Sequence, residues 1–307
     1  MIYTVTLSPA LDYLIWLDHF EYGGLNRSER ISFRAGGKGI NVAVVLSRLG
    51  CPAVCWGFTA GFVGEELVRL LTLQDIRHDF ITVDEGCTRI NVKVKSDEET
   101  EINANGPKIT PKDLQQLKAK AEKLSSGDIL ILSGKPPKNM PDTVYSDLLD
   151  AAAGKNIRTV VDASGNHLLT ALRKKPYLIK PNKTELEELY NENLASIRQI
   201  AEAALKLQEK GAQNVLVSLG AEGALLAADD GKVYTCGIPE GKLVDSTGAG
   251  DSMVAGFIAK DCSGASKEEC LRFAAACGSA SAYSGSLLEA AGLEQILSRT
   301  PKPELLI

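Results

Sequence analysis

The stretch D-S-T-G-A-G-D-S, from Asp245 to Ser252, places nearly bare backbone and then a carboxylate before the helix-like run M-V-A-G-F-I-A. The first N–H groups of a helix have no partner within it and can hold an anion. A carboxylate beside an anion repels it, so its presence at such a site calls for a separate role. The pattern therefore predicts that the Gly248–Gly250 turn stabilises a migrating phosphoryl group while Asp251 takes the proton of an attacking hydroxyl. An Asp251 that only caps the helix is the alternative.

A second glycine-rich helix start, A-G-G-K-G-I-N-V-A, runs from Ala35 to Ala43. Its three glycines let a ligand approach the main chain closely. Lys38 adds a positive charge, and Asn41 adds an amide that both donates and accepts hydrogen bonds. These groups suit a polyhydroxylated, anionic ligand, whereas a tight turn with a helix cap is the structural alternative.

The segment K-P-N-K-T-E, from Lys180 to Glu185, ends a predicted strand and opens a helix. Pro181 stops the strand, and Asn182 with Glu185 three residues later has the spacing of a capping box. The same two side chains suit a Mg²⁺–phosphate region through ordered waters, since Mg²⁺ keeps much of its hydration shell. The two interpretations are compatible.

The segment S-L-G-A-E-G, from Ser218 to Gly223, ends another predicted strand. Glycines at this point leave open surface at the sheet edge, which suits a flat base or a ribose. By itself the segment is equally typical of a hairpin connection.

Several other kinds of site and partner are excluded. The G-x-x-x-x-G-K-[ST] order of a P-loop and the G-x-S-x-G order of a hydrolase elbow do not occur, and no dinucleotide fingerprint follows the opening strand. His19, His78 and His167 are too isolated for a metal site or a catalytic triad. With a net charge of −5 and no polybasic run, we expect no nucleic-acid and no membrane partner.

The seven cysteines are scattered, and their spacing is not typical of a zinc site. We therefore expect buried free thiols and a reducing, cytoplasmic location. The start M-I-Y-T-V-T-L-S-P lacks the positive region and long apolar core of a signal peptide, and no apolar run is long enough to cross a bilayer.

The elements that must position these motifs alternate between strand and helix. The short runs Ile129–Leu132 and Arg158–Val161 have little alternation, as in a parallel sheet covered by helices. Other strands are predicted at Ile2–Leu7, Val54–Phe58, Tyr177–Lys180 and Asn214–Leu219, with a terminal hairpin at Leu225–Ala228 and Lys232–Cys236. Helices are predicted at Gly39–Leu49, Gly64–Leu73, Asp142–Ala153, Thr184–Tyr190, Ser196–Glu209 and Lys267–Tyr283, near His167, and from Ser252. Ligands in such sheets bind beyond the carboxyl ends of the strands, where the motifs fall.

The run from Thr88 to Lys95 does not fit that sheet, because it alternates strictly. Ile90, Val92 and Val94 fall on one face, and polar residues fall on the other. Such a pattern predicts a sheet with one wet side.

A small β lid is therefore expected from residues of about 12–35 and 88–104. Together with the parallel sheet it would form a single domain that spans residues 1–307. A small sheet with one apolar face needs cover, so this face is expected to pack against a second copy and give a homodimer through the lid.

The order of the motifs resembles that of a known family. G-G-K-G-I-N-V-A, S-G at Ser133, K-P-N-K-T-E and D-S-T-G-A-G-D follow one another as in the ribokinase-like (PfkB-type) carbohydrate kinases, over nearly the whole chain. The last motif is highly specific for that family. The resemblance implies an α/β fold, namely a three-layer α/β/α sandwich with a mostly parallel central sheet and a small β-sheet lid. It also implies ATP and Mg²⁺ as cofactors.

Within the family, T-R-I-N-V-K-V together with A-G-G-K-G-I-N is most similar to the bacterial 1-phosphofructokinases. This similarity implies ATP-dependent phosphorylation of the 6-hydroxyl of D-fructose 1-phosphate. Tagatose-6-phosphate kinases and the minor 6-phosphofructokinases are close relatives, so their sugars stay open as alternatives. A non-catalytic sugar-phosphate sensor is a further alternative, against which the intact G-A-G-D sequence argues.

The resemblance also implies roles for individual positions. The catalytic base falls on Asp251, and the anion hole falls on Gly248, Ala249 and Gly250. Contacts with the sugar phosphate fall on Asp12, Gly37, Lys38, Asn41, Arg89, Ser133, Lys135 and Asp251. Contacts with ATP fall on Lys180, Asn182, Ser218, Gly220, Gly223, Thr247, Gly248, Gly250 and Gly278. Asn182 and Glu185 match the motif associated with Mg²⁺, bound through water.

Two positions depart from the pattern of the family. This chain reads S-G-K-P-P where many relatives have S-G-S-L-P, so Lys135 is either an additional phosphate contact or a surface change. The first strand reads T-L-S-P where relatives usually have T-L-N-P. Ser8 is shorter than Asn, so any bracing of the backbone there is expected to differ.

Overall fold

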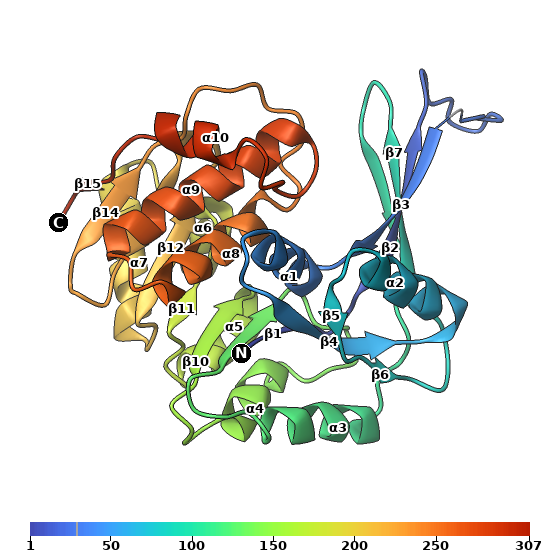
Figure 1. The fold of residues 1–307 in the computed structure, drawn as a ribbon, viewed down its shortest axis with the longest axis horizontal. Coiled ribbons are helices and arrows are strands. Elements are labelled where there is room, and N and C mark those ends of the chain that lie inside the picture. Colours follow the sequence, from blue (N-terminus) through green and yellow to red (C-terminus); the bar gives the residue numbers. More distant parts are fainter. Residues whose placement is uncertain (29) are drawn as a thin grey trace.

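The structure, a computed structural model, describes residues 1–28 and 30–307. A large sheet runs through the molecule with helices on both faces, and a separate four-stranded sheet projects from one end (Figure 1). This smaller sheet is called the lid below. The α/β architecture predicted from the sequence is thereby confirmed.

The main sheet is mostly parallel, with the strand order β15-β14-β13-β12-β11-β10-β9-β1-β4-β5 and with β6 beside β4. Its strands are β1 (Ile2–Thr6), β4 (Ala53–Thr59), β5 (Arg77–His78), β6 (Ile81–Thr82), β9 (Ile129–Ser133), β10 (Arg158–Asp162), β11 (Leu178–Ile179), β12 (Asn214–Ser218), β13 (Ala224–Ala227), β14 (Val233–Cys236) and β15 (Glu304–Leu305). The pairs from β4 to β12 are parallel, whereas β12 to β15 pair antiparallel. The predicted terminal hairpin is therefore confirmed as β13 and β14.

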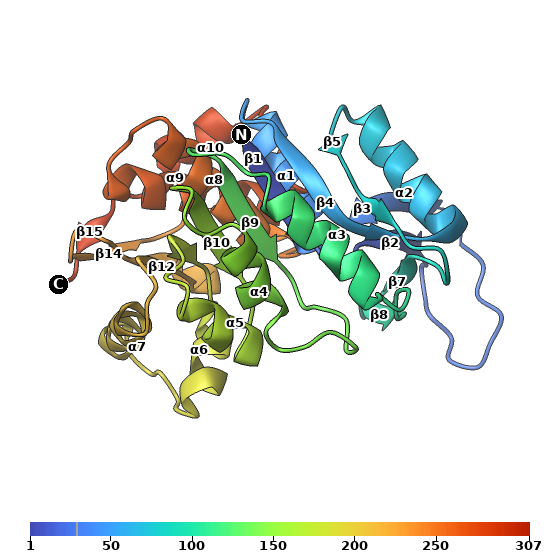
Figure 2. The same cartoon turned by 90° about the horizontal axis from the view of Figure 1, so that it is seen from below.

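Helices form a layer on each face of this sheet (Figure 2). One layer contains α3 (Pro111–Ala121), α4 (Val144–Ala151), α5 (Gly165–Leu172), α6 (Lys183–Tyr190) and α7 (Ile197–Glu209). The other contains α1 (Lys38–Arg48), α2 (Gly61–Leu73), α8 (Ala249–Cys262), α9 (Lys267–Ser284) and α10 (Leu293–Arg299). Each layer buries its own apolar cluster against the sheet, so the core is divided in two by the strands.

Two helices, α3 and α10, were not predicted from the sequence. The start of α3 nevertheless carries a local signal: Thr110 and Asp113 form a capping box, and Pro111 occupies the first turn. Helix α8 also begins three residues earlier than predicted, at Ala249, which places Asp251 in its first turn.

The lid consists of β3 (Arg30–Gly36), β2 (Ala10–Trp16), β7 (Arg89–Lys95) and β8 (Thr100–Asn103), in that spatial order. Its register places Tyr13 opposite Phe33 and Val92, and Val92 opposite Ile102, so one face is apolar across all four strands. The prediction of a wet polar face is wrong for the middle of β7. Asn91 and Lys93 are 8% and 9% exposed.

Both residues are buried because they have partners on the polar face of the lid. The Asn91 amide donates a hydrogen bond to Asp12 at 3.0 Å, and Lys93 pairs with Glu101 at 3.1 Å. The polar face of β7 is therefore a lining of paired groups rather than a surface open to bulk water.

Two further expectations concern cysteines and membrane spans. All seven cysteines are free, and four of them are buried as expected, whereas Cys262 is exposed. Among the helices that the structure describes, none is long and apolar enough to cross a membrane.

The parallel strands β1 and β4 leave no room for a side chain at Gly57, which pairs with Thr6. This residue has φ +152°, and a Cβ atom added to it would lie 2.1 Å from the carbonyl oxygen of Thr6. The contact between Gly57 and Thr6 holds the end of β1 in place. The glycine-rich start of α1 lies against that strand end, so its position depends on the same contact.

We expect Gly57→Ala to lower the free energy of unfolding by about 2–3 kcal/mol, because the added methyl group forces β1 and β4 apart. Gly50→Ala is the matched control, since Gly50 also has a positive φ (+76°) but nothing lies within 4 Å of its added Cβ. The control should cost only about 1 kcal/mol. Urea unfolding measures both, and equal losses would contradict the predicted clash.

Candidate active site

The start of α1 abuts the end of β1. Gly37 is the N-cap with φ +126°, a conformation that favours glycine, and a Cβ atom there would lie 2.6 Å from Cγ2 of Thr6. Gly39 is equally close to the hydroxyl of Thr6. That hydroxyl accepts a hydrogen bond from the N–H of Ile40 at 3.0 Å, so β1 itself supplies a cap for α1. The glycines therefore allow the helix start to lie directly against the strand end.

The start of α8 has no side-chain cap. Its N-cap is Gly248, which has φ +78°. The N–H of Ala249 donates to the carbonyl of Ser246 at 3.1 Å, so this member of the predicted anion hole is already engaged. The N–H groups of Gly250 and Asp251 are first-turn amides that precede the helical ladder, and they can serve an anion.

Asp251 is 5% exposed and accepts a hydrogen bond from Nδ2 of Asn41 at 2.7 Å. Since Asn41 lies on α1, this bond joins the two glycine-rich helix starts. The N-cap of α8 is Gly248 and no side chain caps it, so the interpretation of Asp251 as a simple cap is wrong.

A further buried carboxylate, Asp162 at the end of β10, completes the cluster. It is 1% exposed and lies 3.3 Å from Nζ of Lys38 and 3.5 Å from Nζ of Lys180. Lys180 is also buried and packs over the start of α8, because a Cβ atom on Gly250 would lie 3.1 Å from its Nζ. The Oδ2 atom of Asp162 is buried and accepts no hydrogen bond from residues 1–28 or 30–307.

Burial and the charge of Asp162 raise the pKa of Asp251 from 3.8 to about 7, although Lys38 and the Asn41 hydrogen bond act to lower it. Burial lowers the pKa of Lys38, but Asp162, Asp251 and Glu185 together raise it above its usual value. A carboxyl group poised near neutral pH can accept a proton from a bound hydroxyl.

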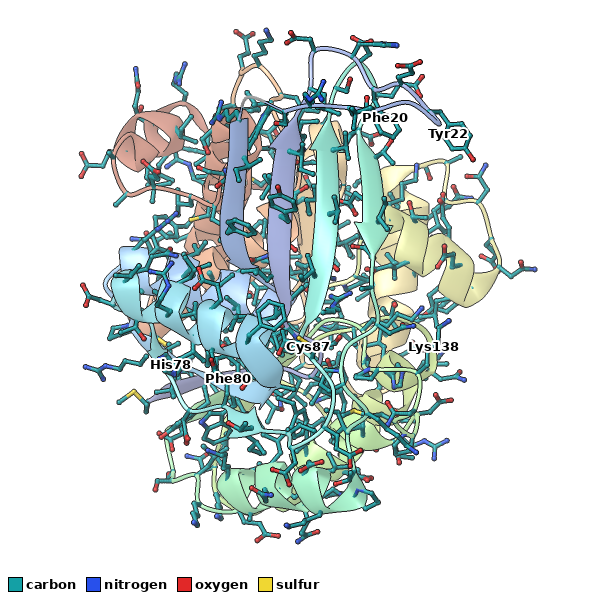
Figure 3. All side chains as sticks on the ribbon, turned by 90° about the vertical axis from the view of Figure 1, so that its right-hand side faces the viewer. Phe20, Tyr22, His78, Phe80, Cys87 and Lys138 are labelled. Carbon is teal, nitrogen blue, oxygen red and sulfur yellow. The ribbon has the colours of Figure 1, made fainter. Side chains whose placement is uncertain are left out.

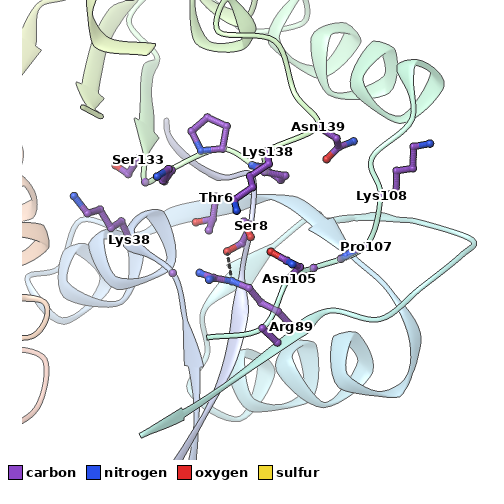
Figure 4. Close-up of a pocket in the computed structure, with 17 residues that line it drawn as sticks. Thr6, Ser8, Lys38, Arg89, Asn105, Pro107, Lys108, Ser133, Lys138 and Asn139 are labelled. Atoms are coloured by element: carbon purple, nitrogen blue, oxygen red, sulfur yellow. Dashed lines mark hydrogen bonds between the residues drawn. The ribbon is translucent and has the colours of Figure 1, made fainter. Parts of the chain in front are cut away.

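A cavity of about 550 Å³ opens beside this cluster, between the end of β1, the lid and the loop after β9 (Figure 4). Five of its lining residues are cationic: Lys38, Arg89, Lys108, Lys135 and Lys138. No carboxylate is found among the described residues that line it. Such a lining attracts an anionic ligand.

A second cavity, of about 630 Å³, lies on the other side of the α8 start. Small and polar residues from several strand and helix ends line it, including the predicted Asn182, Ser218, Gly220, Gly223, Gly250 and Gly278. Leu243, Met253 and Tyr283 add apolar surface. The combination of apolar walls and free helix-start amides suits a flat ring that carries an anionic tail.

The capping box predicted at the edge of this second cavity is confirmed. The N–H of Glu185 donates to Oδ1 of Asn182 at 2.7 Å, and the N–H of Asn182 donates to Oε2 of Glu185 at 2.8 Å. The box fixes both side chains at the start of α6, and Glu185 there is close enough to raise the pKa of Lys38.

The lid contributes Asp12 and Arg89. A Cβ atom on Gly36 would lie 2.7 Å from Oδ2 of Asp12, so the glycine leaves room for this carboxylate. Burial raises the pKa of Asp12, against the lowering effect of Lys93. The Nε atom of Arg89 donates to the carbonyl of Ser8 at 3.3 Å, which orients the guanidinium at the wall of the first cavity (Figure 4).

About half of the residues predicted for the sugar side and the nucleotide side fall into two separate cavities. Gly37, Lys38, Arg89, Ser133 and Lys135 line the first. Other predicted residues line neither cavity. They lie in the lid or at the helix starts: Asp12, Asn41, Lys180, Glu185, Thr247, Gly248 and Asp251. Ala249 lines the second.

Sequence reasoning missed Asp162, Lys108 and Lys138. Asp162 could have been predicted, because it is the last residue of the buried parallel strand β10. Ligands of such sheets bind at the carboxyl ends of the strands. The two lysines lie in loops without a recognisable motif, so only the folded chain brings them to the cavity.

Comparison with known proteins identifies the family of the chain. Residues 5–289 match the pfkB family of carbohydrate kinases. The chain is 41% identical to the 1-phosphofructokinase of Bacillus subtilis, over 97% of both chains. It is 36% identical to the D-tagatose-1-phosphate kinase of Bacillus licheniformis, over 97% of this chain and 98% of that one.

Solved structures are similar as well. The structure of phosphofructokinase-2 from Escherichia coli in complex with fructose-6-phosphate has a TM-score of 0.90 and 33% identity, and covers 97% of this chain and 98% of its own. Ribokinase from Arabidopsis thaliana, at 24% identity, has a TM-score of 0.77 with 96% and 98% covered, which confirms the ribokinase-like fold.

Proposed function

The chain belongs to the pfkB family of carbohydrate kinases, and we propose that it transfers the γ-phosphoryl group of ATP to the 6-hydroxyl of D-fructose 1-phosphate. The products are ADP and fructose 1,6-bisphosphate. One observation carries the proposal: a buried carboxylate, Asp251, lies at the junction of two helix starts, with a cationic cavity on one side and a nucleotide-sized cavity on the other. The similarity to 1-phosphofructokinases supports the choice of sugar.

In this mechanism Asp251 accepts the proton of the sugar 6-hydroxyl. The hydroxyl oxygen then forms a bond with the γ-phosphorus, and the bond from that phosphorus to the β–γ bridging oxygen breaks as ADP leaves. The first-turn amides of α8 and the ammonium groups of Lys38 and Lys180 stabilise the charge that is spread over the transferring group. Arg89 holds the phosphate at the far end of the sugar, since a guanidinium can bind phosphate through two hydrogen bonds.

The residues present also fit a Mg²⁺ ion. Oδ2 of Asp162 is buried and accepts no hydrogen bond from the described chain, although Nζ of Lys38 lies 3.3 Å away. Glu185, whose Oε2 accepts a hydrogen bond from the N–H of Asn182, offers a second carboxylate. Mg²⁺ prefers one or two carboxylates together with waters and phosphate oxygens over a complete protein cage. We propose that Asp162 and Glu185, with Asn182 through water, hold the ion, which supplies charge neutralisation at the phosphates.

D-Tagatose 1-phosphate is a second candidate substrate, because of the similarity to a D-tagatose-1-phosphate kinase. Fructose 6-phosphate and tagatose 6-phosphate remain the alternatives within the family. All four sugars place a phosphate at one end and a primary hydroxyl at the other, so the cavity's charge does not separate them. A coupled assay of ADP release, run with each sugar at matched concentration, decides among them by kcat/KM.

We expect Asp251→Asn to reduce kcat by about 10²–10⁴-fold with the preferred sugar, because the amide cannot accept the proton. The KM values should change little. Unreduced turnover in this variant would remove Asp251 from the mechanism. ADP formation with none of the sugars in the unmodified protein, alongside measurable sugar binding, would favour the non-catalytic sensor.

The pH dependence of kcat/KM provides a separate test. Because the pKa of Asp251 is raised to about 7 and the base acts only when deprotonated, kcat/KM should rise with pH through about 7 and then level off. Asp162→Asn removes a like charge, so the rise should move to lower pH. Titration of the substrate phosphates is common to both proteins and cancels in the comparison. An unshifted profile would contradict the coupling of the two carboxylates.

We further propose that the chain forms a homodimer through the apolar face of the lid. Figure 3 looks onto the four strands of the lid, with Phe20 and Tyr22 in the β2–β3 connection. Ile31, Phe33 and Ile102 are 52%, 44% and 60% exposed, which is unusual for large apolar side chains on one sheet face. Val94 was expected in the interface but is already buried within the chain. We therefore propose that Ile31, Phe33 and Ile102 make the contact with the second copy.

Phe33→Asp should convert the dimer to a monomer at low micromolar concentration, because a carboxylate in the centre of an apolar interface is costly to desolvate. Phe62→Asp is the control, since Phe62 on α2 is 73% exposed and lies outside the lid. Light scattering coupled to size-exclusion chromatography measures both. A monomeric unmodified protein, or a dimer that survives Phe33→Asp, would contradict the proposed interface.

A further inference from the structure

One ion pair connects the lid to residues 245–251, which carry the proposed base Asp251 and are called the catalytic turn below. Lys95 is the last residue of β7, and its Nζ lies 3.0 Å from Oδ2 of Asp245, the residue that opens D-S-T-G-A-G-D. Both side chains are only 21% exposed. Lys95 also pairs with Glu99 within the lid, at 2.5 Å.

Asp245 uses its other carboxylate oxygen inside the turn. Oδ1 accepts a hydrogen bond from the N–H of Thr247 at 2.8 Å, directly before Gly248. The backbone N–H groups of Val244 and Asp245 both donate to the carbonyl of Ala282 on α9, at 2.9 and 3.1 Å. The carboxylate of Asp245 therefore makes two contacts. Oδ1 fixes the backbone that leads into the catalytic turn, and Oδ2 pairs with Lys95 of the lid.

The opposite end of the same strand reaches the cationic cavity. β7 begins at Arg89, which lines that cavity, and ends at Lys95. The strand is paired with β2 along its whole length and with β8 from Asn91 to Val94, so its two ends move together. Any tilt of the lid that brings Arg89 toward a bound anion therefore also moves Lys95 relative to Asp245.

We infer that Lys95 and Asp245 are positioning residues, whose ion pair transmits the position of the lid to the catalytic turn and so aligns the α8 amides and Asp251 for phosphoryl transfer. This inference rests on the proposed kinase function. Neither residue lines the cavities, and neither is required to touch the substrates. The simpler alternative is that Lys95 stabilises only the β7–β8 hairpin through Glu99.

The chain offers variants that separate these two roles. Lys95→Met removes both contacts, Asp245→Asn weakens only the link to the turn, and Glu99→Gln weakens only the hairpin contact. Lys118→Met is the matched control, because Lys118 and Asp147 form a pair of the same 3.0 Å length and similar exposure between α3 and α4. Lys95→Arg keeps the charge and tests rescue.

We expect Lys95→Met and Asp245→Asn each to lower kcat roughly 5- to 20-fold, with the KM for ATP nearly unchanged, because misaligned groups lose rate more than binding. The double variant should be no slower than the slower single variant, since one shared contact is lost. Lys95→Arg should recover most of the rate, and Glu99→Gln and Lys118→Met should keep full activity. Additive effects of the two changes, or a loss in Glu99→Gln equal to that in Lys95→Met, would overturn the inference.

Hydrogen–deuterium exchange supplies a readout that does not depend on turnover. Lys95→Met should speed exchange both in β7–β8 and in the segment 244–251, whereas Lys118→Met should affect neither. Faster exchange in the lid alone would overturn the inference even if activity falls. If the unmodified protein phosphorylates none of the sugars, the proposed function fails, while the exchange experiment still decides whether lid and turn are coupled.

Discussion

Three buried ionisable side chains, Asp162, Asp251 and Lys180, meet a partly exposed fourth, Lys38, where the two glycine-rich helix starts come together, and the surrounding structure serves to keep them there. Asp162 and Asp251 repel each other, and both are buried. Lys38 and Lys180 offset that repulsion. Removing a partner from such a cluster leaves a buried charge uncompensated, which is far more costly than losing an exposed pair. The charges that suit phosphoryl transfer therefore also constrain how the helices and strands can be arranged.

Glycines make this arrangement sterically possible. The helix starts of α1 and α8 are joined through Asn41 and Asp251, and each begins at a glycine with a positive φ. A side chain at Gly37 would collide with Thr6, and one at Gly250 would press against the ammonium group of Lys180. Close packing continues away from the site, where Gly256 on α8 faces Cys277 on α9. Asp251 is thus held by backbone geometry as much as by its own hydrogen bond.

Local sequence was sufficient to predict the parts of this structure that depend on periodicity and capping. The buried strands β9 and β10, helix α1 and the Asn182–Glu185 box followed from the identity of neighbouring residues alone. Contacts across long sequence distances were beyond that reasoning. Asp162 gains its importance only because the parallel sheet brings its strand end between Lys38 and Lys180, 124 residues and 18 residues away in the chain. The polar face of the lid was misjudged for the same reason, since its burial depends on partners from other strands.

The lid shows how one short sequence pattern can serve two different surfaces. Because side chains alternate along a strand, β7 presents Arg89, Asn91, Lys93 and Lys95 on one face and Ile90, Val92 and Val94 on the other. A slip of one residue in its pairing with β2 would exchange the two faces and lose both functions at once. The register is fixed on the polar face by the Asn91–Asp12 hydrogen bond and the Lys93–Glu101 pair. If a second copy covers the apolar face, the lid is held from both sides, so its freedom to tilt over a ligand depends on the dimer as well as on its contacts with the catalytic turn.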